Sequence, residues 1–237
     1  MKLYEAFGLS LNKEGVMISL VGGGGKTSTM FTLAYELACE GKKVLITTTT
    51  AIYNPEGVNN PNIFILGDHV TADGKLKGIT LEKADAIFKE GFYDFILVEA
   101  DGSRGRPIKA PADYEPVIPE ATSVVVGVIG MDAFGQPMSS SHVHRSEILA
   151  KLTKTNMDNS VDEELIVKLV SEPLGLFKNS PPGSRKILLL NKAINTNLEE
   201  TAHRVGSRVI TQCNLIDSVL IGAVLEEKPV KRLLLKY

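Results

Sequence analysis

The chain has 237 residues and a formal net charge of −2, and hydrophobic residues make up 43% of it. These values are ordinary for a globular protein, and they exclude a collagen, a coiled-coil rod and a wholly disordered chain. Because neutralising phosphates requires a surplus of Lys and Arg, the near-zero charge argues against a general nucleic-acid-binding protein. It leaves room for a local basic cleft.

The cysteines and the hydropathy bear on the cellular compartment. Cys39 and Cys213 are far apart and have no CxxC spacing, which excludes a disulfide framework and a Cys-based zinc site. Their apolar or helical surroundings predict buried thiols. Residues 1–14 lack the apolar core of a signal peptide, and no apolar run approaches the ~20 residues that span a bilayer. We therefore expect a reduced, soluble, cytoplasmic protein without a membrane partner.

Short apolar runs alternate with helical patterns along the chain. Strands are predicted at residues 16–21, 43–48, 62–66, 93–98, 122–129, 186–190 and 218–224. Helices are predicted from Lys26 to Gly41, over 80–89 and 146–152, and after two capping boxes, Ser160 with Glu163 and Thr196 with Glu199. Unbroken apolar strands are typical of a parallel sheet that is covered on both faces. The alternation therefore predicts an α/β fold.

A glycine-rich run stands between the first strand and the first long helix: Gly22, Gly23, Gly24, Gly25, Lys26, Thr27 and Ser28. Residues without a Cβ let the backbone wrap a triphosphate closely, and the helix N-terminus presents its positive end to the phosphates. Lys26 is expected to reach the β- and γ-phosphates, and the Thr27 hydroxyl to hold Mg²⁺. A flexible hinge is the alternative, but it does not account for Lys-Thr directly after the glycines.

The loop departs from the usual spacing, because Leu20 stands where a longer loop has its first glycine. It is the shorter Gly-x-x-Gly-Lys-Thr form, which is similar to that of Mur ligases and some small-molecule kinases. With this loop, the predicted fold is P-loop NTPase-like, a mostly parallel sheet with helices on both faces. No repeat or linker interrupts the chain, so residues 1–237 are predicted to form a single P-loop nucleotide-binding domain.

Glu99 and Asp101 end an apolar strand. Acids at this place in nucleotide hydrolases hold Mg²⁺ and orient the attacking group, and two residues that are two apart in an extended chain face the same way. We predict that both contribute to the metal site and, with Lys26, to catalysis. The alternative is that one of them only caps the Asp101–Gly102 turn.

Further polar residues are predicted to line the same cleft. The loop after the acidic strand carries Ser103, Arg104, Arg106 and Lys109, which are predicted to bind a transferred phosphate or an anionic acceptor. A solvated basic loop is the alternative. The hydroxyls of Thr48 and Thr49 end the second strand and are weaker candidates, since β-branched runs are ordinary in strands.

Asn191 and Lys192 follow a later strand and resemble the Asn-Lys-x-Asp element that recognises guanine in GTPases. Ile194 replaces the Asp of that element, so we expect ATP rather than GTP, with Asn191 and Lys192 in a base pocket. A simple strand-to-turn junction is the alternative. His144 and Arg145 are predicted to contact substrate or phosphate, and metal binding there lacks a further ligand.

Three segments together resemble the YqeC family: residues 21–27, 47–50 and 98–111. Residues 126–130, Asp132, His144, Arg145 and Glu147 are also similar, and the resemblance is carried mainly by residues 16–150. The resemblance implies an accessory role in selenium cofactor biosynthesis and in the maturation of selenium-dependent molybdenum hydroxylases. The implied partner is a client hydroxylase or its cofactor.

Three functions are compatible with these residues. The first is a Mg²⁺-dependent enzyme that binds ATP or GTP and acts as a maturation factor by hydrolysis or phosphoryl transfer. The second is a nucleotide-gated switch or chaperone with slow turnover. The third, favoured by the short loop, is a small-molecule kinase or ligase unrelated to selenium.

Overall fold

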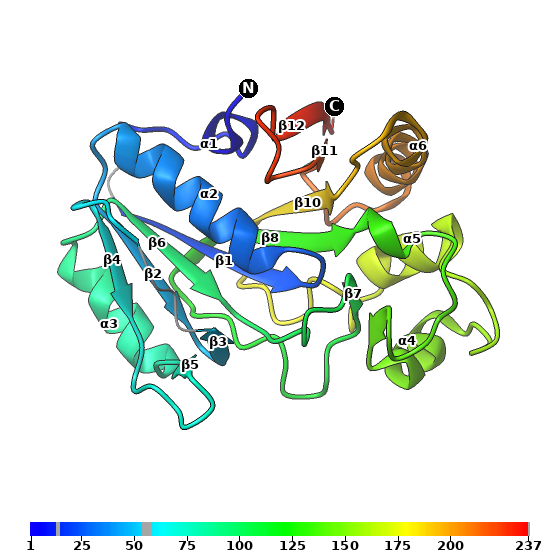
Figure 1. Cartoon of the computed structure of the whole chain (residues 1–237), viewed down its shortest axis with the longest axis horizontal. Coiled ribbons are helices and arrows are strands. Elements are labelled where there is room, and N and C mark those ends of the chain that lie inside the picture. Colours follow the sequence, from blue (N-terminus) through cyan, green and yellow to red (C-terminus); the bar gives the residue numbers. More distant parts are fainter. Residues whose placement is uncertain (13–14, 54–57, 237) are drawn as a thin grey trace.

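The computed structural model describes residues 1–12, 15–53 and 58–236 (Figure 1). The helices are α1 (Leu3–Ala6), α2 (Lys26–Cys39), α3 (Leu81–Glu90), the 3-10 turn η1 (Met131–Ala133), α4 (Ser146–Thr153), α5 (Glu163–Ser171) and α6 (Thr196–Gln212). The strands are β1 (Val16–Gly22), β2 (Val44–Thr48), β3 (Ala51–Tyr53), β4 (Ile63–Leu66), β5 (Lys75–Lys77), β6 (Phe95–Glu99), β7 (Ile108–Lys109), β8 (Thr122–Gly130), β9 (Val143–His144), β10 (Arg185–Asn191), β11 (Ser218–Gly222) and β12 (Val230–Leu235).

Among the described residues, eight strands form one sheet in the order β12-β11-β10-β8-β1-β6-β2-β4. All neighbours are parallel except β12, which is antiparallel to β11. The strand β1 lies between β8 and β6, with Leu20 opposite Glu99 and Gly22 opposite Val128. Parallel strands end at the same edge of a sheet, so the glycine-rich loop, the acidic strand end and the residues after β10 are brought to one edge.

Helices cover both faces of this sheet (Figure 1). Successive residues of a strand point to opposite faces, so β1 contributes Ile18 and Leu20 to the core beneath α1 and α2. Met17 and Val21 of the same strand enter the cores beneath α3 and beneath α5 and α6. Every residue of β1 is therefore buried, which is the physical reason for its mostly apolar sequence, and the hydroxyl of its one polar residue, Ser19, is bonded to the Thr122 hydroxyl at 2.8 Å. The predicted α/β fold with a mostly parallel, doubly covered sheet is confirmed.

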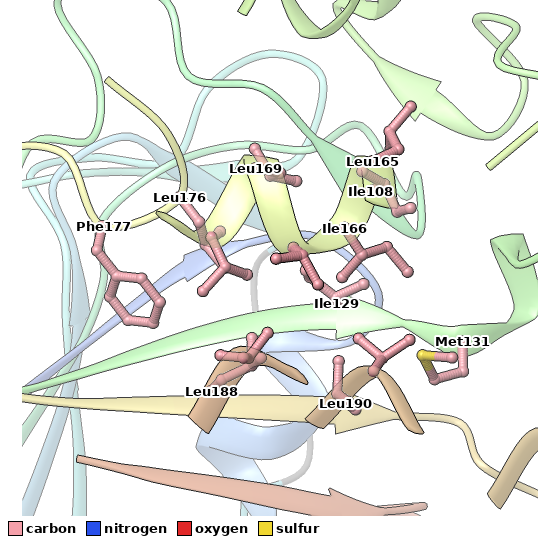
Figure 2. Close-up of a cluster of buried hydrophobic side chains, with 14 of the residues drawn as sticks. Ile108, Ile129, Met131, Leu165, Ile166, Leu169, Leu176, Phe177, Leu188 and Leu190 are labelled. Atoms are coloured by element: carbon pink, nitrogen blue, oxygen red, sulfur yellow. The ribbon is translucent and has the colours of Figure 1, made fainter. Parts of the chain in front are cut away.

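The core beneath α5 shows how closely the second half of the chain packs (Figure 2). Ile166 and Leu169 of α5 pack above Ile129 of β8. Gly127 of β8 lies beneath Phe177, since a Cβ at Gly127 would stand 2.6 Å from the Cζ atom of that ring. A side chain at this position would overpack the core, which typically costs about 1–3 kcal/mol.

Several local predictions are wrong. The helix α5 is capped by Asp162 rather than Ser160, because the Asp162 carboxylate accepts the N–H of Leu165 at 2.8 Å. In α6 the cap is Asn195, whose side-chain oxygen accepts the N–H of Leu198 at 2.9 Å. Cys39 is exposed at the end of α2, whereas Cys213 is buried as predicted.

The sequence patterns did not predict the small pairings β3–β5 and β7–β9, or the antiparallel edge strand β12. Two of these strands have two residues each and two have three, too few for a pattern of alternating side chains to be recognised. Within the described ranges, no helix has both the length and the apolar composition that crossing a bilayer requires.

Candidate functional site

The glycine-rich loop connects β1 to α2 in a backbone conformation that glycine favours. Gly22, Gly24 and Gly25 have φ angles of 94°, 78° and 122°. A Cβ on Gly24 would stand 2.1 Å from the backbone nitrogen of Gly130. The loop is thus held against the end of β8 at a distance that excludes any side chain.

The N–H groups in the first part of the loop donate to carbonyls of other segments. The N–H of Gly23 donates to the Val128 carbonyl at 2.9 Å, and that of Gly24 donates to the Arg106 carbonyl at 3.0 Å. The next N–H groups, of Gly25, Lys26, Thr27 and Ser28, have no acceptor among the described residues. These are the unpaired donors of a helix N-terminus, where a phosphate is bound most readily.

Lys26 extends from the first residue of α2 into a buried position. Its Nζ donates to the Gly22 carbonyl at 2.7 Å, 3.2 Å from Asp101 Oδ1 and 3.7 Å from Glu99 Oε1. Burial opposes its charge, but the carboxylates of Asp101 and Glu99 outweigh burial and raise the pKa of Lys26. The ammonium group is therefore held charged beside the loop.

Thr27 and Glu99 meet beside the unpaired N–H groups. The Thr27 hydroxyl donates to Glu99 Oε2 at 2.7 Å. Burial raises the pKa of Glu99, against the opposing effects of Lys26 and Thr27. A hydroxyl and one carboxylate fit Mg²⁺, which takes oxygen ligands and keeps several waters or phosphate oxygens. Among the described residues, no group of three His, Cys, Asp or Glu side chains forms a metal site made by protein ligands alone.

Asp101 has different surroundings from Glu99. Both of its oxygens accept the N–H of Gly22, at 3.2 and 3.0 Å, and its Oδ2 lies 3.0 Å from Lys109 Nζ. Burial opposes ionisation, but Lys26, Lys109 and the Gly22 N–H hold the pKa of Asp101 below its usual range. The predicted metal-binding role of Asp101 has no free oxygen to support it, and its contacts are those of a residue that positions the loop.

Lys109 connects Asp101 to a second acid. Its fully buried Nζ lies 2.9 Å from Glu115 Oε2, and Arg145 pairs with the same carboxylate oxygen. Burial opposes ionisation of Glu115, yet Lys109 and Arg145 hold its pKa below the usual range. The predicted contact of Lys109 with an anionic substrate has no support from the structure, because the surrounding protein covers this side chain and two acids pair with it. Glu115 was missed, because an isolated acid in a proline-rich segment carries no motif.

A cavity of about 680 Å³ opens over the unpaired N–H groups. This is within the roughly 300–1,000 Å³ of small-molecule sites. Of the sequence-predicted residues, it is lined by Gly24, Gly25, Lys26, Thr27, Ser28, Glu99, Ser103, Arg104 and Lys192. The other lining residues are Ala51, Ile52, Tyr53, Lys75, Gly102 and Gly105. The first four of these come from the β3–β5 pair, and no sequence motif marked them.

The remaining predicted residues lie outside this lining: Gly22, Gly23, Thr48, Thr49, Asp101, Arg106, Lys109, His144, Arg145 and Asn191. The hydroxyls of Thr48 and Thr49 donate to the carbonyls of Glu99 and Val117, at 2.7 and 2.6 Å. These bonds connect the end of β2 to neighbouring segments, and the predicted contact of both residues with substrate has no support from the structure.

Asn191 lies outside the cavity lining, and both polar atoms of its side-chain amide are bonded within the protein. Its Nδ2 donates to the Gly24 carbonyl at 2.8 Å, and its Oδ1 accepts the N–H of Val224 at 3.1 Å. Lys192, by contrast, lines the cavity and pairs with Asp132 at 2.7 Å.

His144 and Arg145 precede α4. Arg145 is occupied by Glu115, and its guanidinium also donates to the Tyr114 hydroxyl at 3.3 Å. Burial, together with the nearby charges of Arg145, Lys109 and Arg104, lowers the pKa of His144 to about 4. Neither side chain lines the cavity, so their predicted contact with its occupant has no support from the structure.

Comparisons with known proteins find a family. The family model described as YqeC protein matches residues 18–147. A protein of Escherichia coli strain K12, named as uncharacterized protein YqeC, is 37% identical over 201 residues, which cover 78% of each chain.

Two solved structures are similar at a lower level. FtsY from Mycoplasma mycoides is 13% identical with a TM-score of 0.37, covering 94% of this chain and 68% of that one. Chloroplast FtsY from Physcomitrella patens is 13% identical with a TM-score of 0.34, covering 90% of this chain and 51% of that one. Similarity at this level carries no argument about function.

Proposed function

We infer that this chain, which belongs to the YqeC family, is a Mg²⁺-dependent P-loop protein that binds ATP or GTP and hydrolyses it or transfers its terminal phosphoryl group. One observation carries the proposal. The Thr27 hydroxyl and the Glu99 carboxylate meet at 2.7 Å, beside Lys26 and the unpaired N–H groups that begin α2. Donors for phosphate and oxygen ligands for Mg²⁺ are the two requirements of a nucleotide triphosphate site.

Each part of the proposed site has a separate role. The N–H groups of Gly25 to Ser28 bind phosphate oxygens, and Lys26 exchanges part of its contact with Asp101 and Glu99 for the terminal phosphates. Thr27 and Glu99 hold Mg²⁺, which neutralises charge on the phosphates when it is bound. Asp101 remains paired with Gly22 and Lys109, so the loop keeps its shape when Lys26 moves.

ATP is the nucleotide we favour. Guanine presents N–H donors that are recognised by a carboxylate acceptor, and Ile194, at the corresponding position, has no polar side-chain atom. Lys192 lines the cavity on this side and can contact the base or ribose.

A nucleotide-gated switch with slow turnover is the second candidate. Among the described residues that line the cavity, Glu99 is the one carboxylate, and it is the Mg²⁺ ligand we propose. No separate acid is then left in the lining to orient an attacking water, which favours slow hydrolysis.

Calorimetry with MgATP, MgGTP and each nucleotide without Mg²⁺ tests the proposal. We expect the wild-type protein to bind at least one nucleotide. Lys26→Met should weaken binding by about 100-fold, in line with the loss of a strong charge-assisted contact. Thr27→Val should remove the gain from Mg²⁺, and Lys151→Met on the exposed face of α4 should bind as the wild type does.

Thermal unfolding followed by circular dichroism checks that each variant is folded, because removal of Lys26 leaves buried acids without a partner. Thr27→Val leaves those ion pairs in place, so it tests the site even if Lys26→Met is unstable. A folded wild-type protein that binds neither nucleotide would contradict the proposal.

The cellular role that we propose is the maturation of selenium-dependent molybdenum hydroxylases in the cytoplasm. The resemblance to the YqeC family supports it. Selenium content and activity of such a hydroxylase, purified from cells with and without this protein, provide the test. Unchanged selenium content and activity in its absence would favour a kinase or ligase unrelated to selenium.

A further inference from the structure

We propose that the part of the cavity beneath β3 and β5 is a subsite for a second, anionic small molecule, held by Arg104 and Lys75 against the ring of Tyr53. Its class is a compound with a phosphate or carboxylate group on a flat apolar body. The proposal rests on the proposed function for one point only, namely which side of the cavity the nucleotide base occupies.

The strand order separates two ends of the cavity. Lys192 follows β10, which lies two strands from β1 on one side, and the β3 residues follow β2, which lies two strands from β1 on the other. The glycine-rich loop stands between them, at the end of β1. A nucleotide with its phosphates on the loop and its base toward Lys192 leaves the β3 end beyond its terminal phosphate.

Arg104 brings a positive charge to the β3 end that no carboxylate among the described residues neutralises. Arg104 lines the cavity and has no carboxylate within ion-pair distance among the residues that the structure describes. Lys75 pairs with Asp73 at 2.6 Å, which raises the pKa of Lys75, while the nearby charge of Arg104 opposes that rise. Arg104 also contributes to the lowered pKa of His144. An arginine without an anionic partner among the described residues, in the wall of a cavity, attracts an anion.

The loop that carries Arg104, residues 102–106, is held in place by the glycine-rich loop. Arg104 has a φ angle of 52°, which is uncommon for a residue with a side chain, and Gly105 follows at 73°. The Arg106 N–H donates to the Ser103 carbonyl at 3.0 Å, and the Arg106 carbonyl accepts the N–H of Gly24 at 3.0 Å. The loop that presents Arg104 is thus bonded directly to the glycine-rich loop, so its position follows that of the phosphates.

Tyr53 provides a flat surface at the same end. Its side chain is 79% exposed, and Lys75 Nζ stands 5.9 Å from the centre of its ring. Ala51 and Ile52 from the same strand also line the cavity. An exposed aromatic ring beside Lys75, on a strand that lines the same cavity as Arg104, suits a ligand with a flat body and an anionic group.

The test uses phenyl phosphate, with inorganic phosphate for comparison. Each is titrated by calorimetry into the full chain, both free of nucleotide and saturated with MgADP. We expect phenyl phosphate to bind in both states, and more tightly than inorganic phosphate. Arg104→Gln and Lys75→Gln should each weaken phenyl phosphate binding by about tenfold, the effect of losing roughly one charge-assisted contact. Tyr53→Ser should remove the advantage of phenyl phosphate over inorganic phosphate.

Lys77→Gln is the matched control, because Lys77 is exposed on the same strand as Lys75 and does not line the cavity. We expect it to bind phenyl phosphate as the wild type does, and MgADP affinity to stay within about twofold in every variant. Equal binding of phenyl phosphate by the Arg104, Lys75 and Lys77 variants would overturn the subsite. So would an MgADP affinity that falls together with that of phenyl phosphate, since the cations would then serve the nucleotide.

The two proposals fail separately. A wild-type protein that binds no MgADP, but binds phenyl phosphate through Arg104 and Lys75, would refute the nucleotide function and retain the anion subsite. A protein that binds MgADP but no phenyl phosphate would do the reverse.

Discussion

Glu99 and Asp101 stand at the end of the same strand, yet they belong to two different regions of the molecule. Glu99 faces the Thr27 hydroxyl in the wall of the cavity, and burial raises its pKa. Asp101 faces inward to Gly22, Lys26 and Lys109, and its pKa is lowered. The tertiary neighbours therefore give these acids different surroundings: Glu99 lies in the cavity wall, where we propose that it holds Mg²⁺, and Asp101 holds the glycine-rich loop.

The comparison extends beyond these two residues. The inward region continues from Asp101 through Lys109 and Glu115 to Arg145, with charges that alternate in sign. Removing one member of a buried ion pair typically costs about 3–5 kcal/mol, because the remaining charge stays buried without a partner. The cavity region has fewer such pairs, and its polar groups can exchange partners when a ligand enters. Stability and binding should therefore respond to different substitutions.

The largest effect is expected at Lys109. Lys109→Met removes the charge between Asp101 and Glu115 and should lower the free energy of unfolding by about 3–5 kcal/mol, as measured by urea denaturation. Lys192→Met is the control, because the Lys192–Asp132 pair is well exposed and should contribute only about 0–1 kcal/mol. Similar losses in the two variants would show that the inward region is not a special contributor to stability.

A smaller effect on stability should distinguish Asp101 from Glu99. Asp101→Asn keeps the shape but loses the charge, so we expect a loss of about 2–3 kcal/mol in stability. Glu99→Gln should change stability by less than about 1 kcal/mol, because burial already disfavours the charge of Glu99.

The same pair of variants gives a second readout. Titration of ATP with and without Mg²⁺ should show that Glu99→Gln loses the gain from Mg²⁺, whereas folded Asp101→Asn retains it. If Asp101→Asn loses the Mg²⁺ dependence and Glu99→Gln keeps it, the two assignments are reversed.

The smallest effect concerns pH, at the edge of the inward region. The pKa of His144 is about 4 in the folded protein, below the usual 6.5, so the unfolded chain binds more protons between these values. The contribution of neutral His144 to stability is present above pH 6.5 and is lost as the pH falls toward 4. Between pH 6.5 and pH 4, the free energy of unfolding of the His144→Asn variant should fall less than that of the wild type, as measured by urea denaturation at each pH. Identical pH profiles would contradict the assignment.

Much of the fold was predictable from local patterns. The parallel strands are mostly apolar because both of their faces are buried, and the glycine-rich run stands between a strand and a helix, as a phosphate loop does. Lys26, Thr27 and Glu99 were likewise identified from residue types and their positions, and the structure brings these three together.

The roles of Asp101, Lys109 and Asn191 were not predictable in this way. Lys109 stands in a basic loop, and nothing in its sequence neighbourhood indicates that Glu115 will turn back to meet it. Asn191 resembles a base-recognition motif, but its amide bonds to the glycine-rich loop and to Val224 instead. Tyr53 and Lys75 lie in strands of three residues each, too short to give a pattern.

The sequence by itself therefore determined the strand and helix alternation, the phosphate loop and the chemistry at its end, because those depend on side-chain periodicity and on residues that are neighbours in the chain. Only the tertiary structure decided which charges face the cavity and which are buried against one another. That choice depends on partners that the fold brings together from distant segments of the chain. For a buried side chain, the partner determines whether its charge is stabilised by an ion pair or is left to bind a ligand.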